Sequence, residues 1–192
     1  NSVPGKIELT EGTVAITGKL DALDVKVDGT GIATLAGTGT ARDLALGPRG
    51  RISPGSGNGV DTLARLTFRN LRIVDPSAVA RFDLAGSTVL TGHDQVRATD
   101  LVQLGGRLAL LTTYTPTPGD RLRLIDKTSA GPITGTFENL AEAGTVTNQA
   151  LIWKATYTGG DGNDFVLEFV GTTNPPPNLP PVLNSPATLE LT

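Results

Sequence analysis

The chain has no cysteine and no methionine, and only 4% of its 192 residues are aromatic. Without cysteine it has no disulfide, no thiolate nucleophile and no cysteine-ligated metal, a composition that suits an exported protein. With a single tryptophan, the core must come mainly from Leu, Val, Ile and Ala. Because the chain starts at Asn1 without methionine, two alternatives stay open: a leader has been removed, or the chain is a segment of a longer protein.

The sequence also lacks a basic stripe, a long apolar run and helical periodicity. Acidic and basic residues are interspersed, the formal net charge is −3, and nucleic acid is therefore not an expected partner. No apolar run approaches the length that crosses a bilayer, so membrane insertion is not expected either. Apolar residues nowhere follow a helical spacing for three turns, and residues 140–143 are too short to form a helix alone.

Glycine (24 residues) and proline (13 residues) separate many short runs in which apolar and polar residues alternate. Such alternation is the pattern of half-buried strands, so the sequence predicts an all-β fold. A hairpin is indicated where two strands flank residues 158–164, which are rich in Gly, Asp and Asn. The expected strands lie at residues 6–10, 14–16, 23–27, 31–35, 63–68, 71–74, 80–84, 94–98, 104–110 (around a Gly-Gly turn), 121–125, 151–157 and 165–170, and residues 53–59 are expected to be a loop.

The C-terminal tail differs from the rest of the chain. Residues 172–181 contain five prolines and predict an extended linker over residues 172–186, after a domain of residues 1–171. A strand-like segment follows, formed by Ala187, Thr188, Leu189, Glu190, Leu191 and Thr192, and it resembles the segment from Ile7 to Thr10. This segment either begins a further domain or is a donor strand that pairs with a neighbouring copy.

A series of motifs resembles the passenger repeats of autotransporter-type proteins and giant bacterial adhesins. The resemblance covers about residues 30–170 and implies a secreted, surface-exposed scaffold built as a parallel β-helix, without catalysis. The motifs that carry it are residues 53–57 (SPGSG), 82–86 (FDLAG), 94–98 (DQVRA), 104–108 (LGGRL), 118–126 (PGDRLRLID), 135–140 (GTFENL) and 157–164 (YTGGDGND).

The fold expected from these features is a short right-handed parallel β-helix, a β-solenoid, with an antiparallel, hairpin-rich C-terminal part. A β-sandwich is the alternative. The expected function is that of a non-enzymatic extracellular or cell-surface subunit of a filament, sheath or adhesin stalk. Its partners would be copies of itself, joined head to tail through stacked ends or the donor strand, because a solenoid leaves open strand edges. A module that binds a surface glycan or a host surface is the alternative function.

One motif suggests a metal. Residues 159–167 fit the Gly-Gly-x-Gly-x-Asp-x-apolar-x nonapeptide of RTX-type calcium β-rolls, with Asp161, Asn163 and Asp164 as half-site ligands. Calcium takes six to eight oxygens, and one copy of the repeat supplies only half a site. A hairpin turn without metal is therefore the favoured interpretation, and no cofactor is expected.

No set of catalytic residues emerges from the sequence. The single histidine, His93, precedes Asp94, but no nucleophile stands nearby to complete an acid–base set, and a surface turn is expected there. A glycosidase-like carboxylate pair could be assembled from Asp21, Asp24, Asp28 and Asp43. These residues lie opposite the apolar side chains of the expected strands, where a solvated face is the simpler interpretation.

Overall fold

The computed structural model describes residues 5–56 and 63–173, and this part of the chain contains strands and no helix. The prediction of an all-β fold is therefore confirmed for it. The fifteen strands are β1 (Gly5–Leu9), β2 (Gly12–Ile16), β3 (Lys19–Val27), β4 (Ala33–Gly37), β5 (Thr40–Leu46), β6 (Gly50–Pro54), β7 (Arg65–Ile73), β8 (Val79–Leu84), β9 (Gln95–Ala98), β10 (Val102–Leu104), β11 (Arg107–Thr112), β12 (Arg121–Lys127), β13 (Thr145–Asn148), β14 (Leu151–Gly159) and β15 (Asp164–Thr172).

The strands form two sheets, and from β1 to β9 successive strands alternate between them. The larger sheet has the order β1-β3-β5-β7-β9-β12-β15-β14-β13, and β10 pairs with β7 beyond the end of β9. The smaller sheet has the order β11-β8-β6-β4-β2. All pairs from β1 to β12 are parallel, whereas β12, β15, β14 and β13 pair antiparallel. Both the parallel part and the antiparallel C-terminal part of the prediction are thus found.

The register aligns apolar side chains from strand to strand. Ile7 pairs with Val25, Val25 with Leu44, Leu44 with Leu71, and Leu71 with Val102. Because side chains alternate between the two faces of a strand, this register keeps a whole column of apolar residues on one face. Except for Ile7 on the outermost strand, every member of the column is buried.

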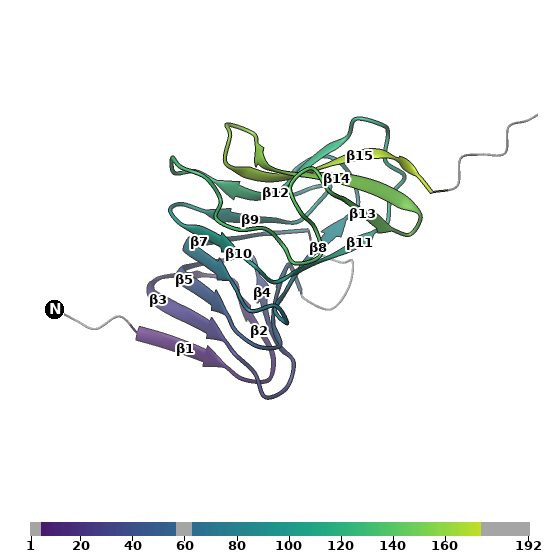
Figure 1. Cartoon of the computed structure of the whole chain (residues 1–192). Coiled ribbons are helices and arrows are strands. Elements are labelled where there is room, and N and C mark those ends of the chain that lie inside the picture. Colours follow the sequence, from purple (N-terminus) through teal and green to yellow (C-terminus); the bar gives the residue numbers. More distant parts are fainter. Residues whose placement is uncertain (1–4, 57–62, 174–192) are drawn as a thin grey trace, which may run out of the picture.

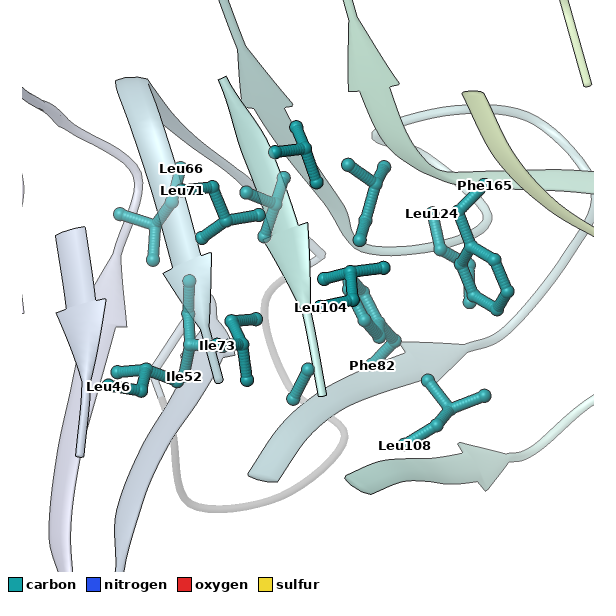
Figure 2. Packing of buried hydrophobic residues seen from close by; sticks show 14 of the residues in the cluster. Leu46, Ile52, Leu66, Leu71, Ile73, Phe82, Leu104, Leu108, Leu124 and Phe165 are labelled. Carbon is teal, nitrogen blue, oxygen red and sulfur yellow. The ribbon is translucent and has the colours of Figure 1, made fainter. Parts of the chain in front are cut away.

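A single hydrophobic core includes residues of both sheets. Leu46 and Ile73 come from the larger sheet, and Ile52 and Phe82 from the smaller one, and all four are almost completely buried. Figure 2 shows these side chains in the space between the ribbons of the two sheets. The period-two pattern thus places one face of each sheet in the core, although all five residues of β4 are buried, including those of its opposite face.

The C-terminal part has an aromatic core, whereas the core of the parallel part is mainly aliphatic and includes two phenylalanines, Phe68 and Phe82. The rings of Trp153 and Phe169 lie edge to face at 5.4 Å, and those of Tyr157 and Phe165 lie 4.7 Å apart. The Tyr157 hydroxyl donates to the carbonyl of Leu140 at 2.6 Å, so the ring also holds the loop before β13. This layer packs against the last strands of the parallel part, at the opposite end of the molecule from β1 (Figure 1).

Two local predictions are wrong. The expected loop 53–59 begins too early, because Ser53 and Pro54 belong to β6. The two strands expected at residues 63–68 and 71–74 are one continuous strand, β7. The Gly-Gly turn at residues 105–106 separates two strands as expected, and these strands enter different sheets, because β10 pairs with β7 in the larger sheet and β11 with β8 in the smaller. A Cβ on Gly106 would lie 2.7 Å from the Ala78 carbonyl oxygen, so glycine permits a corner between the sheets. The expected segments from residue 174 on, including 187–192, lie outside the described residues.

No helix long and apolar enough to span a membrane occurs in the described ranges.

Candidate functional site

The end of the molecule formed by β1 and β2 is open. Each is the outermost strand of its sheet, and no described strand pairs with its outer edge. Val14 of β2 is 37% exposed, although its register partner Leu35 and the next residue of that column, Ile52, are fully buried. The apolar columns of the core therefore reach solvent at this end, which presents unpaired backbone groups beside apolar side chains.

The opposite end of the smaller sheet is covered by side chains. Its last strand, β11, would leave a free edge, but the Asn139 side-chain amide accepts from Leu108 N at 2.8 Å and donates to Leu108 O at 3.0 Å. Asn148 Nδ2 donates to Leu110 O at 3.0 Å. These two asparagine side chains bond to backbone groups of β11 with which a further strand would otherwise pair, so the edge of β11 is partly blocked.

The four aspartates considered for a carboxylate pair lie on the outer face of the larger sheet, and each has a partner. Asp24 forms a two-bond ion pair with Arg42, and Asp28 lies 2.5 Å from the Lys26 ammonium. Asp21 accepts from the Thr40 hydroxyl. Asp43, the register partner of Asp24, accepts from the side chains of Arg69 and Asn70. They form a ladder of paired surface charges, as the solvated-face interpretation expects.

His93 is not on the surface, contrary to the prediction. It is fully buried, its Nδ1 lies 3.4 Å from the Gly86 carbonyl oxygen, and the backbone of Arg123 on β12 also lies against the ring. The turn before it is closed by a backbone hydrogen bond, which Ala85 N donates to Gly92 O at 2.7 Å. Burial lowers the pKa of His93.

Asp94 is also fully buried and joins the two sheets. Its carboxylate accepts from Ala64 N at 2.9 Å, just before β7, and from Asp83 N at 3.0 Å, in β8. Burial raises the pKa of Asp94 to about 7, despite these two bonds, since desolvation of the charged form is the larger effect. With two backbone donors from distant segments on its carboxylate, Asp94 has the geometry of a structural tie between strands.

The calcium-like turn is a hairpin between β14 and β15, and its polar residues diverge. Asp164 Oδ1 accepts from Lys127 N at 2.8 Å, and its other oxygen lies 3.4 Å from Arg123 Nε. Asn163 Nδ2 instead donates to Ser129 O at 2.6 Å. Gly160 has a left-handed backbone conformation, with φ 61°, which glycine adopts without the steric cost of a Cβ. Within the described ranges, no group of three His, Cys, Asp or Glu side chains could hold a metal ion.

A groove of about 630 Å³ crosses the outer face of β12, β15 and β14. Arg121 and Glu168 pair across it at 2.7 Å, and Glu142 accepts from the backbone N–H of Tyr157 at 2.6 Å. Lys154 lies opposite Glu168 in register and lines the same groove. The lining contains no aromatic side chain, so the platform that usually stacks against a neutral sugar ring is missing.

Sequence analysis missed three polar residues with structural roles. Asn139 appeared only as part of the 135–140 motif, and Asn148 and Lys127 were not singled out. Lys127 is 4% exposed, and its ammonium is enclosed by the loop that follows β12. A lysine just after an alternating strand carries no local signal of burial, since charged side chains are ordinarily solvated.

No protein-family model matches the chain, and none of the curated proteins compared with it does so either.

Proposed function

We propose that the chain is a non-enzymatic structural subunit of an extracellular or cell-surface bacterial filament, sheath or adhesin stalk, joined to neighbouring copies through its β1 end. The bacterial and secreted setting rests on the resemblance to autotransporter-type passengers and on the absence of cysteine. The observation that carries the assembly is the contrast between an open β1–β2 end and a β11 edge blocked by Asn139 and Asn148.

We further propose that the parallel part is a short β-solenoid. Successive strands alternate between two sheets and pair in parallel with the next strand of the same sheet, which is the connectivity of a coil. A right hand is proposed because parallel crossover connections are almost always right-handed. A coil of this kind adds stability by stacking further strands on its open end.

The blocked β11 edge favours the donor strand over the direct stacking of ends. The segment Leu189-Glu190-Leu191 repeats the apolar–acidic–apolar order of Ile7-Glu8-Leu9. Placed parallel beside β1, Leu189 would extend the column of Ile7 and Leu191 that of Leu9, which continues through Val27. The donor segment would thus cover the apolar side chains that β1 leaves at the edge.

The linker is long enough for this exchange. Residues 172–186 would span about 46 Å as an extended, proline-rich segment at about 3.1 Å per residue. From β15 to β1 the larger sheet crosses six strand spacings, or about 29 Å at roughly 4.8 Å each. Because β1 and β15 lie toward opposite ends of the molecule (Figure 1) but within this reach, the length of the linker permits pairing with β1 of the same chain as well as of a second copy, and the concentration dependence of the test below separates the two.

The test compares the full chain with a chain that ends at Gly171, by sedimentation at rising concentration and by negative-stain microscopy. The full chain is expected to form rods with a regular axial repeat, and the shortened chain to stay monomeric. A shortened chain that still polymerises would refute the donor strand and leave the stacking of ends. Monomers from both chains would refute assembly.

The alternative, a module that binds a surface glycan, is favoured only by the groove that Arg121, Glu168 and Lys154 line. Competable hits for a monomeric chain on a glycan array, lost in Lys154→Ala, would support it over assembly.

A further inference from the structure

The ammonium of Lys127 is held in a cage of oxygens. It donates to the carbonyls of Ser129, Ala130 and Gly131 and to the Ser129 hydroxyl, each at 2.9 Å. The residue is 4% exposed, so these contacts replace its water shell. Four acceptors surround three N–H bonds, which means that charge, and not only directed hydrogen bonding, binds the group.

The cage is fixed from outside as well. Ser129 Oγ donates to the Asp100 carbonyl at 2.7 Å, which turns its lone pairs toward the ammonium. Asn163 Nδ2 donates to Ser129 O, and Lys127 N donates to Asp164. Loop 128–131 is thereby tied to the β9–β10 connection and to the β14–β15 turn, so that the oxygens are held in place by neighbours other than Lys127.

We propose that this cage is a site for a monovalent cation of ammonium size, which the chain fills with its own Lys127 side chain. The oxygens are all neutral and lie at 2.9 Å, a distance that suits ammonium or potassium. Calcium binds oxygens at about 2.3–2.6 Å and magnesium at about 2.0–2.1 Å, and both favour carboxylates. Rings of carbonyl oxygens are the ligands that replace the hydration shell of potassium.

The site also has access for an ion. A hollow of about 520 Å³, lined by residues 128–132 and 161–163, adjoins the loop that forms the cage. Asn163 Oδ1 lies in this region, buried and without a partner among the described residues. An ion that entered after removal of the lysine side chain would therefore find one further acceptor near the cage.

The first test uses the full wild-type chain labelled with ¹⁵N at the lysine Nζ atoms. The chain has five lysines. The Nζ protons of Lys127 are expected to exchange with water at least about tenfold more slowly than those of the other four, so that at neutral pH only the Lys127 signal is observed. Exchange at the same rate as in the exposed Lys154 would overturn the proposal, and this result does not depend on any variant that folds poorly.

The second test removes the side chain. Lys127→Ala is expected to have a lower melting temperature than the wild type. Its melting temperature should be a few degrees higher in ammonium chloride or potassium chloride than in tetramethylammonium chloride of the same ionic strength. The control, Lys154→Ala, removes an exposed lysine and should melt alike in all three salts. Equal responses of the two variants would refute the cation site, and neither result depends on whether the protein assembles.

Discussion

At the residue scale, the most informative groups are polar side chains inside an apolar fold. Asp94 accepts two backbone N–H bonds from different sheets, and His93 beside it is enclosed by a closed loop. Burying a charge is costly unless its hydrogen bonds are satisfied, and those of Asp94 are. Desolvation of the charged form nevertheless raises the pKa of Asp94 to about 7.

Asp94 is expected to make stability depend on pH. Because its folded pKa of about 7 lies above the ordinary 3.8, the folded chain holds this proton more tightly than the unfolded chain. The resulting stabilisation is full below about pH 4 and is lost as pH rises through about 7. At about 1.4 kcal/mol per pKa unit, the free energy of unfolding should fall over this range by on the order of 4 kcal/mol more in the wild type than in Asp94→Asn.

Urea unfolding of both chains across this range measures the difference. The lowered pKa of His93 acts in the opposite direction and is common to both chains, so it largely cancels. Asp83 and Arg81, the charged groups that act on Asp94, are also unchanged. Parallel pH profiles for the two chains would contradict the assignment.

At the element scale, strand edges decide what can be added. The edge of β11 receives three side-chain hydrogen bonds from Asn139 and Asn148, while no described strand or side chain is bonded to the outer edge of β1. Side chains that bond to the free backbone groups of an edge strand are one way in which β-proteins avoid unwanted strand pairing. The two ends of the molecule therefore differ in what they can bind.

Asn139→Ala should destabilise the fold and expose the β11 edge. It removes two hydrogen bonds and leaves both backbone groups of Leu108 unpaired, at a cost of about 1–3 kcal/mol in the free energy of unfolding. Asn148→Ala removes one bond, to Leu110 O, and should cost less. Urea unfolding gives both values, and sedimentation shows any new self-association. An Asn139→Ala chain as stable as Asn148→Ala would contradict the role of this amide.

At the scale of the whole molecule, the two ends differ: the C-terminal end is an aromatic layer, and the β1 end has unpaired strand edges. Aromatic contacts such as Trp153–Phe169 lie at one end, and the outermost apolar residues of β1 and β2 at the other (Figure 1). Growth by strand addition is therefore expected at the open end that β1 and β2 form. Such a module would cap a stack at its C-terminal end and extend it at its N-terminal end.

A peptide of residues 182–192 is expected to bind a chain that ends at Gly171. Ile7→Thr keeps a β-branched residue in β1 but removes apolar contact with Leu189, and should weaken binding by about 1 kcal/mol, roughly fivefold. Val170→Thr is the control, since Val170 is 45% exposed on β15, far from β1. Isothermal titration measures both. Equal weakening by the two substitutions would place the peptide elsewhere.

Local pattern was enough to predict most strands and the β14–β15 hairpin, whereas β5, β6 and β13 lie outside the expected ranges. Alternation of apolar and polar residues is a property of a few neighbouring positions, and so is the Gly/Asp/Asn turn at residues 158–164. Alternation does not say which strands pair. For that reason the sequence predicted two strands around the turn at Gly105 and Gly106 without indicating that they enter different sheets.

The sequence by itself therefore determined the all-β class, the aliphatic core and the positions of most strands. Only the tertiary structure decided the pairing of Val25 with Leu44 and Leu44 with Leu71, and the burial of His93 and Lys127. The physical reason is that parallel pairing joins residues far apart in the chain, and the burial of a polar side chain depends on acceptors that such distant segments bring to it.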